Sequence, residues 1–137
     1  MSKSYIGGCA CGAIHYDIPA EPLVMNDCQC RQCQRDSGTG HGSYLTFPRA
    51  AVTVRGQANT WDLVGDNGYV KSRGFCANCG TLVYLTLPAV PDIFVVYAGS
   101  LEDPSRYRPQ FVCWTAAGHQ WDHMDPDLPR FEKMPPA

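Results

Sequence analysis

Short runs of alternating apolar and polar residues cover most of the chain, and this period of two is typical of β-strands. The runs are rich in Val, Tyr, Phe and Thr, and Gly, Pro, Asp or Asn separates one run from the next. We therefore predict an all-β fold. The predicted strands cover residues 4–8, 13–18, 43–47, 51–55, 59–64, 69–75, 81–87, 92–99 and 110–114.

The first two runs flank the sequence CACG at residues 9–12, which we expect to form the turn of a hairpin. One short helix is predicted over residues 30–37, ended by Gly38. The length of 137 residues is that of a single domain covering 1–137. We place its core at about 7–125 and an irregular, proline-rich tail at 126–137.

Charge and hydropathy exclude several kinds of partner. Eleven Lys and Arg stand against thirteen Asp and Glu, so the formal net charge is -2, and no basic run is present. We therefore expect no nucleic-acid partner. No stretch of the chain approaches the roughly 18 apolar residues of a membrane-spanning helix, and the first residues lack the apolar core of a signal peptide. We expect no membrane partner and a protein kept in the cytoplasm.

Eight cysteines are many for a chain of this length. In a reducing compartment, metal binding explains them better than disulfides do. Seven of the eight lie in tight clusters, and Cys113 stands alone. Thiols one or two residues apart rarely bridge one another, but they converge easily on one ion.

The sequence FCANCGT at residues 75–81 has the form of a zinc knuckle, in which Gly80 favours a tight turn beneath two thiolates. A knuckle supplies two ligands, and a second pair followed by a glycine lies near the N-terminus. We predict a closed, structural zinc site with four ligands. The alternatives are buried thiols without a metal, or a redox pair. The predicted ligands are Cys9, Cys11, Cys76 and Cys79.

The sequence CQCRQC brings Cys28, Cys30 and Cys33 together within six residues. The remaining thiol, Cys113, lies in an apolar stretch where a small buried side chain is common. If Cys113 does not join them, the fourth position stays open, as in zinc sites that bind a substrate. The alternatives are that Cys113 or a histidine closes the site, or that the three thiols hold no metal. Three thiolates make zinc a weak Lewis acid and favour a sulfur ligand, so we expect a thiol substrate that reacts with a soft or carbonyl electrophile.

Three residues that follow this cluster are weaker candidates for substrate binding. Arg35 could pair with a substrate carboxylate, although an exposed charge on a short helix is the more ordinary interpretation. His41 could line the pocket or supply a proton, or simply lie in a surface loop. Ser37 could brace the metal loop through backbone hydrogen bonds. Tyr44 is expected to be an aromatic residue of the core or of a sheet face.

Four segments together resemble the glutathione-dependent formaldehyde-activating enzyme family, which includes the centromere protein V-like proteins. They are GGCACGAIHY, CQCRQCQRDSG, FCANCGTLVY and AGSLEDP, at residues 7–16, 28–38, 75–84 and 98–104. The resemblance implies a β-tent fold. It also implies a structural zinc at Cys9, Cys11, Cys76 and Cys79, and catalytic zinc ligands at Cys28, Cys30 and Cys33. The family usually has a basic pair after the third cysteine of the second segment, where this chain has Gln34 and Arg35.

The resemblance implies a reaction as well: the condensation of glutathione with formaldehyde to S-hydroxymethylglutathione, classed as that of a carbon-sulfur lyase. We therefore favour a zinc-dependent enzyme whose partner is a small-molecule thiol such as glutathione. Two alternatives stay open. One is a non-catalytic module in which both zinc ions are structural, and the other is a redox or metal-labile protein whose clustered thiols are readily oxidised.

Overall fold

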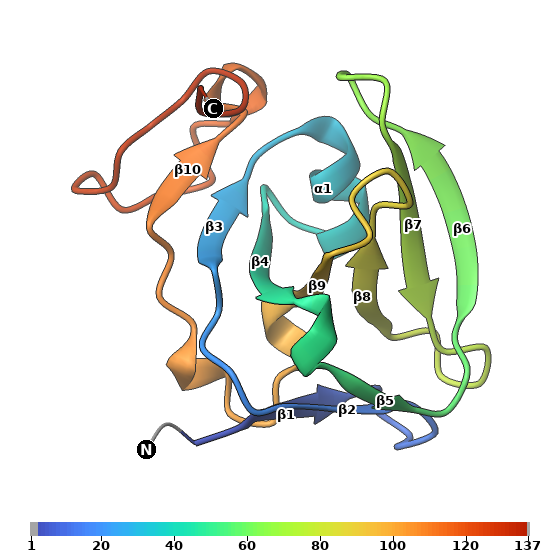
Figure 1. The fold of residues 1–137 in the computed structure, drawn as a ribbon. Helices are drawn as coiled ribbons and strands as arrows, with labels where there is room; N and C mark the ends of the chain where they lie inside the picture. The colour runs from blue at the N-terminus through green and yellow to red at the C-terminus, as the bar shows by residue number, and fades with distance from the viewer. Residues whose placement is uncertain (1–2, 137) are drawn as a thin grey trace.

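The computed structural model describes residues 3–136 and contains two β-sheets (Figure 1). The smaller sheet has three antiparallel strands in the order β1-β2-β5. In Figure 1 it lies at the base of the molecule, and the larger sheet rises above it. The strands of the smaller sheet are β1 (Tyr5–Gly8), β2 (His15–Ile18) and β5 (Thr53–Arg55).

The larger sheet has seven strands in the order β10-β3-β4-β9-β8-β7-β6. Neighbouring strands are antiparallel except β10, which pairs with β3 in parallel. The strands are β3 (Val24–Cys28), β4 (Gly42–Pro48), β6 (Asn59–Val64), β7 (Val70–Phe75), β8 (Leu82–Thr86), β9 (Ile93–Tyr97) and β10 (Phe111–Cys113).

Helical structure is sparse. Within residues 3–136 the single α-helix is α1 (Arg31–Ser37), between β3 and β4 in the chain. No helix in this range is long and apolar enough to cross a membrane. The remaining turns include four short 3-10 helices: η1 (Arg49–Ala51), η2 (Ala98–Ser100), η3 (Pro104–Arg106) and η4 (Thr115–Ala117).

The structure confirms the all-β prediction, the N-terminal hairpin and the short helix. Gly38 ends α1 in the left-handed conformation, with φ of 75°, and its N–H bonds to the carbonyl of Gln34. The strand β3 is absent from the prediction. Its sequence, VMNDC, contains two residues of weak strand propensity, Asn26 and Asp27, and ends at the first cysteine of the cluster. Pairing with β4 on one side and β10 on the other makes it a strand.

Side chains of the larger sheet pack into two separate clusters of buried residues, because successive residues of a strand point to opposite faces. On β4 and β9, Leu45, Phe47, Phe94 and Val96 are buried in the main core. That core also takes in Tyr5, Tyr16 and Ile18 from the smaller sheet. The intervening residues Tyr44 and Val95 belong instead to a second cluster that contains Cys28, Cys33 and Cys113.

The C-terminal tail lies beside β10 rather than projecting away from the sheets (Figure 1). Arg130 forms a β-bridge with Val112, and the N–H of Phe131 bonds to the carbonyl of Val112 at 2.9 Å. The rings of Phe111 and Phe131 pack edge to face, with centroids 5.7 Å apart. The division of the chain into a core of about 7–125 and a tail of 126–137 stays a prediction.

Candidate metal centres

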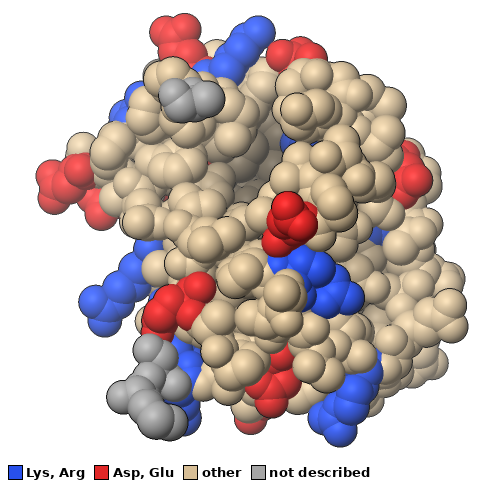
Figure 2. Space-filling view, viewed as in Figure 1, with Lys and Arg blue, Asp and Glu red and all other residues tan. Residues whose placement is uncertain are grey.

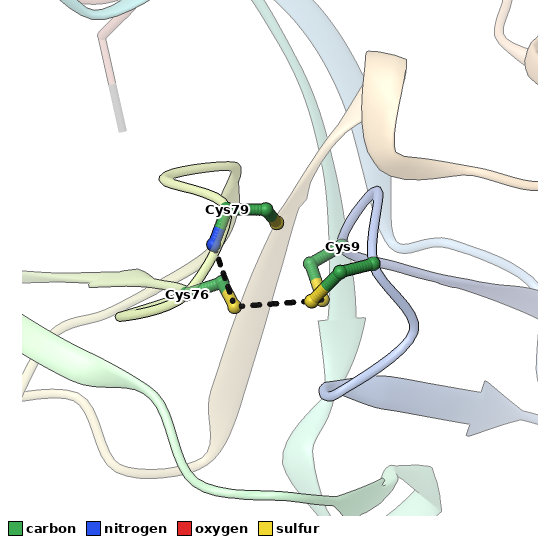
Figure 3. Close-up of side chains that lie close together, drawn as sticks. Cys9, Cys76 and Cys79 are labelled. Carbon is green, nitrogen blue, oxygen red and sulfur yellow. Dashed lines mark hydrogen bonds between the residues drawn. The ribbon is translucent and has the colours of Figure 1, made fainter.

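The two cysteine pairs that are farthest apart in the sequence meet in space. The turn between β1 and β2 carries Cys9 and Cys11, and the turn between β7 and β8 carries Cys76 and Cys79. All four sulfur atoms lie within 4.8 Å of one another. Figure 3 shows the two turns facing each other with the thiols of Cys9 and Cys76 between them. We call these four residues the closed cluster.

Backbone N–H groups in both turns point at these sulfurs. Asn78 and Cys79 donate to Sγ of Cys76, with N to Sγ distances of 3.4 and 3.5 Å. Ile14 donates to Sγ of Cys9 at 3.2 Å. Gly80 makes the turn possible because it adopts φ of +78°, a conformation that side chains disfavour. Hydrogen bonds with Thr81 lower the pKa of the Cys79 thiol to about 5, which favours the thiolate that a metal requires.

The spacing of the sulfurs fits a metal ion. Sγ of Cys11 lies 3.7 Å from Sγ of Cys9 and 3.7 Å from Sγ of Cys76. A tetrahedral zinc ion with zinc–sulfur bonds of about 2.3 Å holds its sulfurs about 3.8 Å apart, whereas a disulfide requires about 2.05 Å. The donor set of the closed cluster therefore suits one tetrahedral ion.

A second group of three thiols lies at the junction of β3 and α1. Sγ atoms of Cys28, Cys30 and Cys33 also lie within 4.8 Å of one another. Cys28 ends β3, Cys30 is the N-cap of α1, and Cys33 is buried in the first turn of the helix. Sγ of Cys30 accepts the N–H of Cys33 at 3.4 Å. We call these three residues the open cluster.

The electrostatics of the open cluster favour negative charge on one sulfur. Hydrogen bonds with Cys28 and Cys33 lower the pKa of the Cys30 thiol to about 2. The pKa of Cys28 is raised, first by a hydrogen bond with Cys113. The hydroxyl of Tyr44 donates to Sγ of Cys33 at 2.9 Å, and burial raises the pKa of Tyr44 well above its usual range, so this donor stays protonated.

Cys113 lies beside the open cluster without joining it. Its sulfur donates to the carbonyl of Asp27 at 3.5 Å and accepts from the side-chain amide of Asn26 at 3.6 Å. Within residues 3–136, neither Cys113 nor any histidine completes the three-thiol group to four ligands. Two cysteine clusters of the chain could therefore hold metal ions, one with four protein ligands and one with three.

A pocket with a volume of about 250 Å³ opens at the open cluster and contacts all three of its cysteines. It lies on the face of the larger sheet opposite the main core, so residues of β8 and β9 form one wall. Leu85 and Val95 belong to that wall, and Tyr44 and Tyr97 lie close to the thiols. A small molecule in this pocket would meet the open cluster and the larger sheet together.

The comparisons with known proteins agree with this arrangement. The family model described as "Glutathione-dependent formaldehyde-activating enzyme" (GFA) matches residues 4–117. The chain belongs to the GFA family. A solved structure, the crystal structure of a Rhodobacter sphaeroides protein that was a Northeast Structural Genomics target, superposes with a TM-score of 0.57. It is 18% identical, and the match covers 92% of this chain and 98% of that one, so the two share a fold.

The other predicted site residues of this GFA-family chain lie outside the pocket. Arg35 is exposed on α1. Ser37 accepts the N–H of Thr39 at 3.2 Å and donates to the carbonyl of Gln34 at 3.4 Å, so it braces the end of the helix. Nδ1 of His41 lies 2.9 Å from a carboxylate oxygen of Asp122, on the neighbouring surface. Roles for these residues in substrate binding stay predictions.

Gln34, which follows the third cysteine of the open cluster, serves the fold. Its side chain is buried, and its amide nitrogen donates to the carbonyls of Gln29 and Ala117 at 2.9 and 3.0 Å. Its amide oxygen lies 3.1 Å from Nε2 of His119. Gln34 thereby connects α1 to the segment that follows β10.

Three charged residues of the pocket are absent from the predictions. Asp36 of α1 and Arg73 of β7 form an ion pair with two contacts, at 2.5 and 3.0 Å, and both side chains are largely buried. Lys71 of β7 also lines the pocket. In the sequence these residues look like ordinary surface charges on a strand and a helix. Only the approach of β7 to α1 brings them to the thiols.

Proposed function

We propose that the protein is a zinc-dependent carbon-sulfur lyase that joins a small-molecule thiol to an aldehyde and cleaves the adduct in the reverse direction. One observation carries the proposal: three thiols converge at the end of an accessible pocket, and no fourth ligand from residues 3–136 closes the group. Four ligands from the protein make a structural site, whereas three leave a position for a substrate.

The two clusters would then have different tasks. Cys9, Cys11, Cys76 and Cys79 would hold a structural zinc, and Cys28, Cys30 and Cys33 would hold a second zinc. The chemistry that zinc supplies in a three-thiolate set is to bind a further sulfur and to lower the pKa of that thiol while it remains nucleophilic. The hydrogen bond from Tyr44 to Cys33 would fix the orientation of one ligand and reduce the charge on its sulfur.

The remaining steps belong to the thiol, the aldehyde and the pocket. The substrate sulfur adds to the aldehyde carbon, a carbon–sulfur bond forms, and the carbonyl electron pair moves to oxygen, which takes a proton. Tyr97 lines the pocket beside the thiols. Burial, followed by the negative charge of Asp36, raises its pKa, so its hydroxyl is protonated at neutral pH. We propose Tyr97 as the donor to the developing alkoxide.

The family description supplies glutathione and formaldehyde as the first substrates to test. We propose the cytoplasm as the compartment, because all eight cysteines are free and seven of them lie in the two clusters. The net charge of -2 supports small-molecule substrates over nucleic acid.

Zinc content and turnover together test the proposal. The protein purified under reducing conditions should hold about two zinc ions per chain, and Cys30→Ser about one. Cys30→Ser should also lose the protein-dependent exchange between glutathione, formaldehyde and their adduct, measured by NMR above the uncatalysed rate. The matched control is Cys113→Ser, which should keep both ions because Cys113 contacts Cys28 but is not one of the three grouped thiols.

Three results would contradict the proposal. Equal turnover by Cys30→Ser and the wild-type protein would remove the open cluster from the reaction. Loss of the second ion in Cys113→Ser would show that Cys113 closes the site. A wild-type protein with about one zinc per chain would favour a structural or redox role for the open cluster.

A further inference from the structure

Most of the wall of the pocket away from the thiols is apolar, although the amides of Asn26, Gln32 and Asn67 and the hydroxyl of Thr46 also line it. Aliphatic side chains reach it from β8 and the residue after it, from β9, from β6 and from the tail. Figure 2 shows a hollow between the C-terminal tail and the β6–β7 side of the molecule, and most of the surface around it is uncharged. The aliphatic residues that line the pocket are Leu63, Leu85, Leu87, Ile93, Val95 and Met134.

The charges in the pocket are almost balanced. Asp36 and Arg73 neutralise each other in a largely buried ion pair. Lys71 is the one charged residue lining the pocket that forms no ion pair with another described residue. Glutathione brings two carboxylates and an ammonium group. The lining offers it one free cation and no free carboxylate, so two of its three charges would meet only neutral amides and hydroxyls in place of water.

The size of the pocket also suits a small organic group. A volume of about 250 Å³ lies below the range of about 300–1,000 Å³ that is usual for sites of larger ligands. Formaldehyde alone would leave the aliphatic walls in contact with water. A hydrocarbon group of several carbons would cover Leu85, Leu87 and Ile93, and removing this apolar surface from water would favour binding.

From these three observations we propose that the pocket binds a hydrocarbon group, attached either to the sulfur of the thiol or to the carbonyl carbon of the aldehyde. The preferred substrates are then small apolar thiols or alkyl aldehydes rather than a tripeptide with formaldehyde. This inference rests on the proposed function, because it concerns the substrate of the same open cluster.

A thiol series tests it without measuring turnover. Ethanethiol to pentanethiol and glutathione are titrated into the protein loaded with cobalt in place of zinc, and the sulfur-to-cobalt absorption reports binding. Each added methylene should tighten binding about fourfold, so pentanethiol should bind about 60-fold more tightly than ethanethiol. Glutathione should bind more weakly than butanethiol. Cys30→Ser, which lacks the open cluster, should show no thiol response.

A parallel series with formaldehyde to pentanal, at a fixed concentration of ethanethiol, distinguishes the two positions of the hydrocarbon group. A chain-length effect in the thiols places it on sulfur. An effect confined to the aldehydes, seen as tighter apparent binding of ethanethiol, places it on the carbonyl carbon. Either result supports the inference.

Variants tie the effect to this pocket. Leu87→Asn should reduce the tightening of thiol binding from about fourfold to about twofold per methylene, since part of the wall becomes polar. The matched control is Leu23→Asn, because Leu23 is 61% exposed and lies outside the pocket. Met134→Gln is a second test that leaves folding intact, since Met134 is an exposed residue of the tail. This substitution should weaken the binding of pentanethiol more than the binding of ethanethiol.

The outcomes separate the two proposals. If no thiol changes the cobalt spectrum, the proposed function is wrong and this inference fails with it. If glutathione and ethanethiol bind, but neither series depends on chain length, the inference is overturned while the proposed function stands. An equal chain-length effect in Leu87→Asn, Met134→Gln and the wild-type protein would also overturn it, since the hydrocarbon would then lie elsewhere.

Discussion

At the scale of single residues, the contact between Tyr44 and Cys33 gives a sheet aromatic a function that its sequence position does not reveal. Tyr44 packs against Tyr97, with ring centroids 5.3 Å apart, and its hydroxyl donates to Sγ of Cys33. Gly42 makes room for this hydroxyl, because a Cβ at that position would clash with it. The position of the phenol is therefore set by its own strand.

Tyr44→Phe should weaken metal binding at the open cluster and spare the closed one. Loss of a hydrogen bond to a ligand typically costs about 10- to 100-fold in metal affinity. The measurement is competition for zinc with a chromophoric chelator, which resolves the weaker of the two ions. Tyr84→Phe is the matched control, because Tyr84 packs against Phe94 in the same sheet and bonds to no thiol. Equal zinc affinity in Tyr44→Phe and the wild type would contradict the assigned role.

At the scale of elements, α1 is held against β7 by the ion pair of Asp36 and Arg73. The helix has seven residues, too few to be stable alone, so its position depends on tertiary contacts. The side chain of Asp36 is 7% exposed and also accepts from Gln32 at 2.9 Å. Cys30 and Cys33 lie on the same short element, so the ion pair also helps to position two thiols of the open cluster.

Arg73→Met should destabilise the protein by about 2–4 kcal/mol, because it leaves the carboxylate of Asp36 buried with one remaining partner. The free energy of unfolding in urea is the measurement. Asp66→Asn is the control, since the pair of Asp66 and Lys133 is about two-thirds exposed on both sides, and exposed pairs contribute about 0–1 kcal/mol. Equal losses in the two variants would show that burial of the Asp36 pair does not matter.

At the scale of the whole molecule, the two clusters connect different parts of the fold. The closed cluster links the β1–β2 turn of the smaller sheet to the β7–β8 turn of the larger one. The open cluster is confined to the junction of β3 and α1 and faces a pocket. A metal in the closed cluster would therefore contribute to global stability, because it closes a long loop of the chain.

Cys79→Ser should lower the free energy of unfolding by at least about 3 kcal/mol. For a domain of this size, that loss corresponds to a fall of about 10 °C in the midpoint of thermal unfolding. Cys30→Ser should cost less than half as much, because serine replaces cysteine well at the N-cap of α1. Thermal unfolding followed by circular dichroism measures both. A chelator should bring the wild type close to Cys79→Ser. Equal losses in the two variants would mean that both clusters hold the fold together.

The sequence by itself determined the all-β class, the two cysteine pairs and the CQCRQC group. Periodicity along the chain and the glycines at turns are local properties, so the strands, the hairpin and the end of α1 at Gly38 followed from them. Cysteines one or two residues apart are forced together by the chain, so the pairs and the CQCRQC group were recognisable before any folding. The strand β3 was missed because its pairing partners, not its residues, make it a strand.

Only the tertiary structure decided what surrounds the thiols. The position of Cys113, the donation from Tyr44 to Cys33 and the approach of Arg73 to Asp36 join residues of separate elements. Such contacts depend on strand order and on the face of the sheet to which each side chain points. A one-residue change of register would move each side chain of the strand to the opposite face and break these contacts. For the same reason the aliphatic walls of the pocket became visible only when β6, β8, β9 and the tail were brought together.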